Sequence, residues 1–128
     1  VSYSSAPFDK TGIEAYNNDG MCLVFKGFIE DPSEYSDDIH ALFIVENSAG
    51  EERYVNVDYD SLSINGFMTD FICYSQTLLD GEFTILDIEI TDELDIDDFS
   101  DITELEFELD IRDKDYSQVS EPTITVHF

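Results

Sequence analysis

Basic residues are scarce in this sequence. Its 128 residues include 5 Lys and Arg against 31 Asp and Glu, which gives a formal net charge of -26. Nucleic acids and anionic lipid surfaces attract proteins through basic patches, so this composition argues against both kinds of partner and favours cations or basic proteins. The simplest interpretation of the acidity is solubility in a secreted or crowded environment. A specific charge-based role and adaptation to high salt are the alternatives.

Long apolar runs are also missing. None approaches the roughly 20 residues of a membrane span, so we expect no membrane insertion by this segment. The 2 cysteines, Cys22 and Cys73, are too few and too far apart for a zinc site. They either form one disulfide between strands in an oxidising compartment or stay as free thiols in a core, and the sequence favours neither.

Candidate nucleophile and base pairs are lacking as well. Ser or Cys nucleophiles normally need a histidine base, and the only histidines, His40 and His127, adjoin no nucleophile motif. Paired carboxylates could serve glycoside hydrolysis, but among 31 acids any two look paired. We therefore expect no enzyme, no catalytic residue and no cofactor other than calcium.

The strongest pattern present is an unbroken alternation of apolar and acidic residues in the segment 104–111. Period two is typical of a strand with one face in a core and one face in water. The apolar set is Leu105, Phe107, Leu109 and Ile111, and the set expected in water is Glu104, Glu106, Glu108 and Asp110.

Similar alternation, separated by turn residues, predicts about nine strands in a single domain over residues 1–128. The strands are expected at 13–16, 22–29, 39–47, 53–60, 62–64, 71–75, 82–90, 104–111 and 123–128, and the turns at 17–20, 31–33, 48–50, 65–66 and 80–81. Asn65-Gly66 is the preferred pair for a two-residue type I′ hairpin. One short helix is expected at 92–99, with Thr91 as its N-cap.

These elements predict an all-β fold, an immunoglobulin-like β-sandwich of two antiparallel sheets with one short helix. Its core is expected to contain Leu23, Phe25, Leu42, Ile44, Val55, Val57, Ile64, Leu86, Ile88, Leu105, Phe107, Leu109, Ile124 and Val126.

Three segments carry a resemblance to a known family. IHALFIVEN at 39–47, DSLSINGFM at 60–68 and ITELEFEL at 102–109, leading to Asp113, are similar to the IEN strand end, SINGY hairpin and I-x-x-I-E-F strand of a family of exported domains from gut Firmicutes. The resemblance covers about residues 13–128, with Phe67 where the family often has Tyr. It implies an immunoglobulin-like sandwich, commonly on secreted or lipoprotein chains, and assigns no functional residue.

Calcium is the metal that the acidic loops could bind, because it takes six to eight oxygen ligands. No loop fits the EF-hand pattern. The candidate ligands are Asp92, Asp95, Asp97, Asp98 and Asp101 around the predicted helix, with Glu93 beside them, and Asp110, Asp113 and Asp115 after the alternating strand. A third acidic loop contains Asp31, Glu34, Asp37 and Asp38. A solvated acidic loop is the alternative interpretation of each cluster.

The function that we predict is non-enzymatic. The chain is expected to be an extracellular or cell-surface interaction module, anchored upstream, that contacts another protein through loops or a sheet edge. Its polar start at Val1, without Met, fits a mature form from which a signal or anchor has been removed. The alternatives are a calcium-dependent module and a carbohydrate-binding domain, in which Tyr35 and Tyr116 could stack on a sugar.

Overall fold

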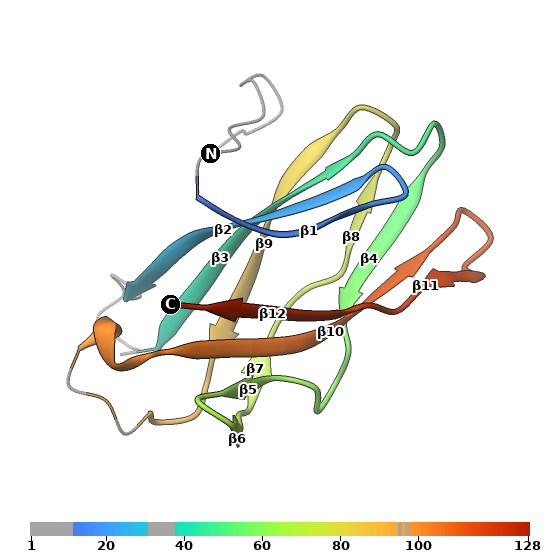
Figure 1. Ribbon diagram of the computed structural model, residues 1–128. Helices are drawn as coiled ribbons and strands as arrows, with labels where there is room; N and C mark the ends of the chain where they lie inside the picture. Colours follow the sequence, from blue (N-terminus) through green and yellow to red (C-terminus); the bar gives the residue numbers. More distant parts are fainter. Residues whose placement is uncertain (1–11, 31–37, 95, 97) are drawn as a thin grey trace.

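The computed structural model describes residues 12–30, 38–94, 96 and 98–128. Two antiparallel sheets pack against each other as a sandwich (Figure 1), which confirms the predicted all-β fold. One sheet has the order β1 (Ile13–Asn18), β2 (Met21–Glu30), β3 (Ile39–Asn47), β9 (Phe83–Ile90) and β7 (Phe71–Ile72). The other has the order β6 (Phe67–Met68), β5 (Ser63–Ile64), β10 (Glu104–Arg112), β4 (Arg53–Val57) and β8 (Gln76–Leu78), and β11 (Gln118–Ser120) and β12 (Thr123–His127) also pair with β10.

The predicted helix at 92–99 is wrong. The described part of this segment is irregular, and a single turn of 3-10 helix, η1 (Phe99–Asp101), follows it. Leu94 and Ile96 explain the difference, because both pack against the core. Residues two apart lie on one side of an extended chain, whereas a helix places them on different faces. No helix among the described residues is long and apolar enough to cross a bilayer.

The core lies between the sheets, and the strand alternation predicts most of it. Two predicted members, Leu42 and Ile44, are wrong: they are only partly buried, while Ala41, Phe43 and Val45 are fully buried. Both faces of β3 are apolar, so its own period could not show which face is inward. The other predicted core residues are confirmed as buried, namely Leu23, Phe25, Val55, Val57, Ile64, Leu86, Ile88, Leu105, Phe107, Leu109, Ile124 and Val126.

An irregularity in β2 extends the core to the surface. The register of β2 against β3 shifts between Phe25 and Gly27, as in a β-bulge, so that Phe25 and Phe28 lie on the same side although they are three residues apart. The two rings contact each other with centroids 5.0 Å apart. The aromatic contacts continue in both directions, through Phe43 and Phe107 into the core and through Phe99 and Phe128 to the surface.

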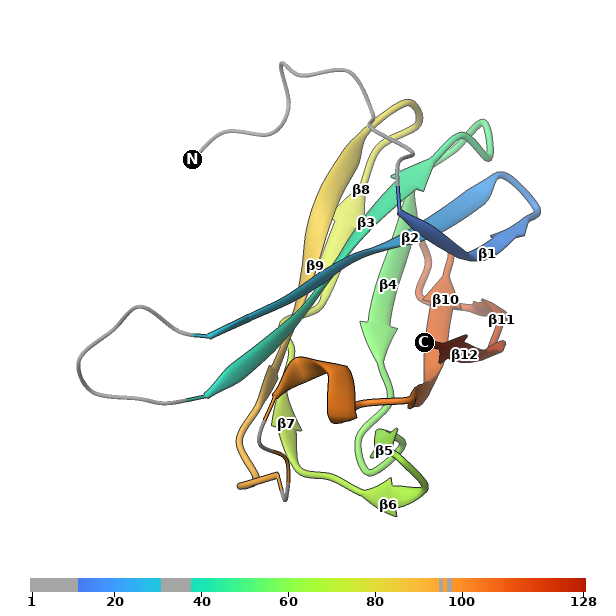
Figure 2. The ribbon, with the colours of Figure 1, turned by 60° about the vertical axis from the view of Figure 1, so that its left-hand side comes forward.

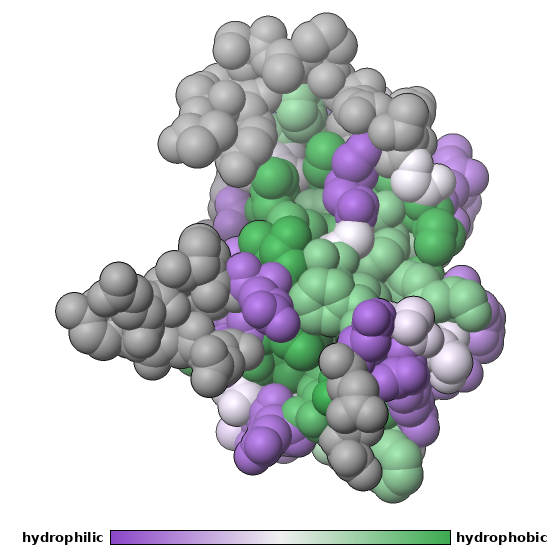
Figure 3. Space-filling view, turned by 90° about the vertical axis from the view of Figure 1, so that its left-hand side faces the viewer, coloured by the Kyte–Doolittle hydropathy of each residue, from purple (hydrophilic) through white to green (hydrophobic). Residues whose placement is uncertain are grey.

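The face of the molecule drawn in Figure 3 has apolar surface in its middle and hydrophilic surface beside it. Phe128 is 46% exposed, whereas Phe25 is 6% exposed. The core is therefore not fully closed by the described residues at the edge between the two sheets.

The segment from β7 to β8 changes sheets. β7 pairs with β9 in the first sheet, and β8 pairs with β4 in the second. Cys73 lies in the short passage between them and is partly buried, while Cys22 is buried in β2. No disulfide joins the two in the structure. Burial, with a smaller contribution from the charge of Asp87, raises the pKa of the Cys73 thiol to about 12.

The turns at one end of the sandwich are tied together by Asn47, which is fully buried. Its side-chain amide donates to the carbonyls of Glu51 (2.7 Å) and Leu78 (3.0 Å), and its side-chain oxygen accepts from the Ala49 N–H (3.0 Å). Its backbone also bonds the turn at residues 81–82. One side chain therefore joins the β3–β4 turn to the β8–β9 turn, at the upper right of Figure 1.

The β1–β2 turn docks on the same end. A Cβ at Gly20, which has φ of 81°, would lie 2.5 Å from the Cα of Ala49. Glycine is required here by both the close approach and the positive φ. The Gly20 carbonyl accepts the Ser48 N–H at 2.7 Å, which completes the end that we call the Asn47 end.

Candidate functional site

The predicted metal ligands around 92–101 mostly bond their own loops. Asp98 is the N-cap of η1, and its side chain accepts from the Ser100 N–H at 2.7 Å. That backbone hydrogen bond is the first cause of the lowered pKa of Asp98. Asp101 closes the capping box, and Asp92 accepts from the Asp70 N–H at 2.8 Å. Asp95 and Asp97 lie outside the described residues, as do Asp31, Glu34, Asp37 and Tyr35.

The second predicted group is also held in local hydrogen bonds. Asp113 accepts from the N–H groups of Asp115 and Ser117 and so stabilises the β10–β11 turn. Asp110 was expected in water but is 5% exposed, because Arg112 and Gln118 cover it. The Arg112 Nε donates to Asp110 at 2.8 Å, and the Gln118 amide donates to it at 3.0 Å. The hydrogen bond from Arg112 to Asp110 and the charge of Asp110 raise the pKa of Arg112.

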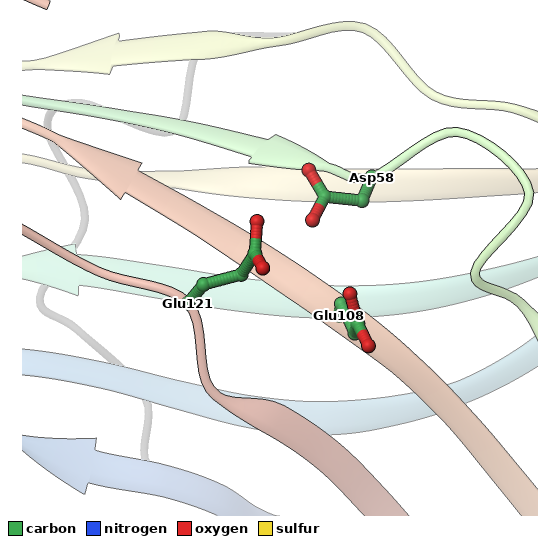
Figure 4. A group of neighbouring side chains, drawn as sticks. All are labelled: Asp58, Glu108 and Glu121. Carbon is green, nitrogen blue, oxygen red and sulfur yellow. The ribbon is translucent and has the colours of Figure 1, made fainter. Parts of the chain in front are cut away.

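A different group of acids converges in space. Asp58 follows β4, Glu108 lies in β10 and Glu121 lies in the β11–β12 turn, and one carboxylate oxygen from each is within 4.8 Å of the others. Figure 4 shows the carboxylates of Asp58 and Glu121 pointing toward each other, with Glu108 beside them. We call these three residues the acidic triad.

Backbone hydrogen bonds fix the three segments that carry the triad. The Asp58 N–H donates to the Glu108 carbonyl at 2.9 Å, and the Leu109 N–H donates to the Pro122 carbonyl at 3.0 Å. The Gln118 amide donates to Glu121 at 3.1 Å. The acids are therefore held close together by the pairing of the sheet rather than by attraction for one another.

The electrostatics of the triad favour a bound proton or cation. Burial raises the pKa of Asp58, and a hydrogen bond with Glu121 and the charges of nearby acids raise it further, to about 6. Glu108 and Glu121 are exposed, so solvent can reach the group. Three oxygens of this kind suit a hard divalent cation such as calcium, with water as the remaining ligands.

A second candidate site lies at the end of the sandwich opposite Asn47, around the β5–β6 hairpin (lower part of Figures 1 and 2). The predicted Asn65-Gly66 turn is confirmed, with φ of 53° and 83°. The Asn65 side-chain amide donates to the Asp101 carbonyl at 2.9 Å, and its oxygen accepts from the N–H groups of Thr103 (2.7 Å) and Glu104 (3.1 Å). The hairpin is therefore fastened to the start of β10.

This fastened hairpin carries two of the most exposed apolar side chains among the described residues. Phe67 is 75% exposed and Met68 is 65% exposed. Both belong to β6, the terminal strand of its sheet, whose outer edge pairs with no described strand. Exposed aromatic residues and Met on a rigid element are typical of contact surfaces, where these residue types are enriched.

A groove of about 370 Å³ adjoins these two side chains. One wall is formed by Ile64, Phe67 and Met68 of the hairpin. The other is formed by described residues that follow β9, two apolar side chains and two acids: Leu94, Ile96, Asp92 and Glu93. We call this feature the hairpin groove.

The charge around the hairpin groove has one sign. A neighbouring hollow of about 400 Å³, which shares lining residues with the groove, contains Asp38 as well as Asp92 and Glu93. A third, beside η1, contains Glu30 and Asp98. No Lys, Arg or His is among the described residues that line any of the three.

The histidines form no catalytic arrangement with a nucleophile among the described contacts. His40 Nδ1 lies 2.7 Å from an oxygen of Asp87, across neighbouring strands β3 and β9. His127 Nδ1 lies 3.6 Å from Glu104 on the paired strand β10. Tyr116, one of the two tyrosines expected to stack on a sugar, is 61% exposed and contacts the ring of Tyr54 with centroids 5.3 Å apart.

No protein-family model and no curated protein matches this sequence. The structure is similar to a solved structure, the FixG-related protein from Vibrio parahaemolyticus, at 12% sequence identity and a TM-score of 0.39. The match covers 84% of this chain and 95% of that chain. A likeness this distant carries no argument about function. The resemblance to the exported Firmicutes domains stays a prediction.

Sequence reasoning missed both features, each for its own physical reason. Glu108 was recognised as part of an acidic strand face, but its neighbours Asp58 and Glu121 are 50 and 13 residues away in the chain. Only the pairing of β10 with β4 and the return of the chain at β12 bring them together. The hairpin was predicted from Asn65-Gly66, but the exposure of Phe67 could not be, because Phe is among the residue types that are most often buried.

Proposed function

We propose that this domain is a non-enzymatic interaction module, exposed outside the cell or on its surface, that binds another protein through the hairpin end. The observation that carries the proposal is the pair of exposed apolar side chains on the β5–β6 hairpin, Phe67 at 75% and Met68 at 65%. Burying two such side chains against a partner contributes about 1.5–3 kcal/mol each.

The rigidity of the hairpin supports the same proposal. Asn65 holds the turn to the start of β10 through three partners, so little conformational entropy is lost when a partner binds. The open edge of β6 offers backbone hydrogen bonds in addition to the side chains. Exposure outside the cell is supported by the resemblance to exported domains and by the acidic composition.

The test compares two immobilised proteins, the wild type and the double variant Phe67→Thr/Met68→Thr. Threonine keeps the strand preference of β6 and removes most of the apolar surface. Both are exposed to an extract of the source organism, and retained proteins are identified by mass spectrometry. A protein retained by the wild type and lost from the variant supports the proposal. Identical sets from both proteins would overturn it.

The location is tested separately on intact cells. Surface protease should degrade the full-length protein without cell lysis if the domain is outside. Full protection, with degradation only after lysis, would contradict the extracellular part of the proposal.

Calcium binding is the second candidate function, because the acidic triad is a specific group of converging carboxylates. A thermal melt after chelation, repeated with calcium, magnesium and matched ionic strength of sodium, tests it. A stabilisation by calcium that exceeds the others and disappears in Glu121→Gln supports a site at the triad. Equal shifts with all salts would show only screening of the acidic surface.

A further inference from the structure

We infer that the hairpin groove binds an extended, cationic peptide segment in which apolar and basic residues alternate. This inference rests on the proposed function, since it names the chemistry of the partner at the same surface. The first observation is geometric: the groove is an open hollow of about 370 Å³ between the β5–β6 hairpin and the described residues that follow β9. A peptide strand lying along β6 would run beside both walls.

The apolar half of the recognition is provided by the groove itself. On the hairpin wall, Ile64 is buried, while Phe67 and Met68 are exposed. Alternate side chains of an extended peptide project to one side, so a peptide strand can place every second residue against this wall. Met is flexible and polarizable, and it adapts to apolar side chains of different shapes.

The basic half follows from charge complementarity. Every ionisable residue among the described residues that line the groove is an acid, Asp92 and Glu93, and both are exposed. The adjoining hollow adds Asp38, and the whole chain carries a net charge of -26. Such a field attracts cationic segments and accelerates their association.

The same charge argues against other occupants. Two copies of a chain with a net charge of -26 repel each other, so a second copy is a poor occupant. An acidic or phosphorylated segment is repelled as well. A neutral apolar peptide would use the hairpin wall and leave Asp92 and Glu93 without a complementary charge.

The experiment titrates isotope-labelled protein with defined peptides and follows backbone amide NMR shifts at physiological ionic strength. The probe is the capped peptide Lys-Leu-Lys-Val-Lys-Leu-Lys. One comparison peptide replaces Leu and Val by Ser and tests charge alone, and another replaces Lys by Glu. We expect the probe to shift the amides of residues 64–69 and 92–94, and to bind at least about tenfold more tightly than either comparison peptide.

Two protein variants separate the apolar and the acidic contributions. Phe67→Thr/Met68→Thr should lower the affinity for the probe about tenfold. Asp92→Asn/Glu93→Gln should lower this affinity several-fold and reduce its dependence on salt. Asn at 92 keeps an oxygen that can accept from the Asp70 N–H. The matched control Glu14→Gln/Asp115→Asn removes the same charge from exposed positions elsewhere and should leave the affinity nearly unchanged.

Several results would overturn the inference. Equal binding of the Ser peptide would mean diffuse charge attraction, and shifts centred away from the groove would mean another site. Dimerisation of the protein that Phe67→Thr/Met68→Thr abolishes would assign the groove to a second copy. If the probe fails while the variant still loses a natural partner from the extract, only the peptide chemistry is wrong and the proposed function stands. If no partner depends on Phe67 and Met68, the proposed function fails.

Discussion

Asn47 and Asn65 lie at opposite ends of the sandwich, and each uses its side chain to join separate segments. Asn47 is fully buried, and the loops that it joins, 47–51 and 78–82, close over the end of the core. Asn65 is partly buried, and the hairpin that it fastens carries Phe67 and Met68 outward into solvent. Hydrogen bonds of an asparagine side chain thus close one end of the domain, and those of another hold exposed apolar side chains in place at the other end.

The comparison teaches which end is available for binding. At the Asn47 end, the carbonyls and N–H groups of the turns are used within the domain, as the backbone bonds of Asn47 with Gly81 and Glu82 show. At the hairpin end, side-chain hydrogen bonds also hold the hairpin in place, yet its apolar surface faces water and acidic residues line the hairpin groove. Hydrogen bonds that close the fold are concentrated at the first end, and the surface that we propose for recognition lies at the second.

The largest expected effect comes from a variant that disrupts the Asn47 end. Asn47→Ala removes three side-chain hydrogen bonds and leaves the Leu78 carbonyl buried without its donor, so we expect the free energy of unfolding to fall by about 3 kcal/mol. Urea denaturation measures this. Asn17→Ala, at an exposed position, should change stability by less than about 0.5 kcal/mol. Equal effects of the two variants would contradict the role of Asn47.

The second effect loosens the hairpin end. Asn65→Gly keeps the positive φ but removes the side-chain bonds to Asp101, Thr103 and Glu104, and we expect a loss of about 2 kcal/mol. Asn65→Ala adds the strain of positive φ, about 1 kcal/mol more. Hydrogen exchange should show faster opening in the hairpin than in β3. Uniform acceleration through the sheet would mean that Asn65 supports the whole fold.

The third effect concerns the triad, which lies between the two ends. The pKa of Asp58 is raised from 3.8 to about 6, so the folded state binds more protons than the unfolded state in this interval. The contribution of Asp58 to stability is therefore present at low pH and is lost as pH rises from about 4 to about 6.

Asp58→Asn should remove this loss and raise stability at neutral pH by about 1 kcal/mol, since the site is partly solvated. Melts at several pH values compare it with Asp115→Asn, which removes one charge from an exposed loop. If the stabilities of Asp58→Asn and Asp115→Asn depend on pH in the same way, the effect comes from net charge and not from the triad.

The smallest expected effect separates exposed side chains of the hairpin from side chains that support the core. Phe67→Thr/Met68→Thr should change the free energy of unfolding by less than about 1 kcal/mol, because both side chains are mostly in solvent. Phe43→Leu, in the core and in contact with Phe107, should cost about 1–3 kcal/mol. A large loss in the hairpin variant would show that β6 supports the fold and would weaken its assignment as a contact surface.

The sequence allowed the strands and one turn to be predicted, because local patterns determine them. The strand 39–47 has the predicted bounds, and Asn65-Gly66 forms the expected hairpin. The inward face of β3 could not be predicted, since Leu42 and Phe43 are both apolar and only the pairing with β2 and β9 selects Phe43. The short strands β6, β8 and β11, which the patterns did not indicate, depend on long-range pairing in the same way.

The candidate sites were less predictable than the fold. Acids such as Asp98 and Asp113 looked like metal ligands in the sequence, and the structure uses them as caps of a 3-10 helix and a turn. A carboxylate that accepts backbone N–H groups and one that binds a metal have the same local signature. The triad depends on contacts between residues far apart in the chain, which single-sequence patterns do not encode.

The passage of the chain from β7 to β8 limits how far the two sheets can separate at this edge. Only residues 73–75 separate the two strands, so the link from Ile72 to Gln76 spans at most about 14 Å when fully extended. Packed sheets are already about 10 Å apart. The passage therefore acts as a short tether at this edge of the domain, and under a force that pulls the sheets apart it would become taut after a displacement of only a few ångströms.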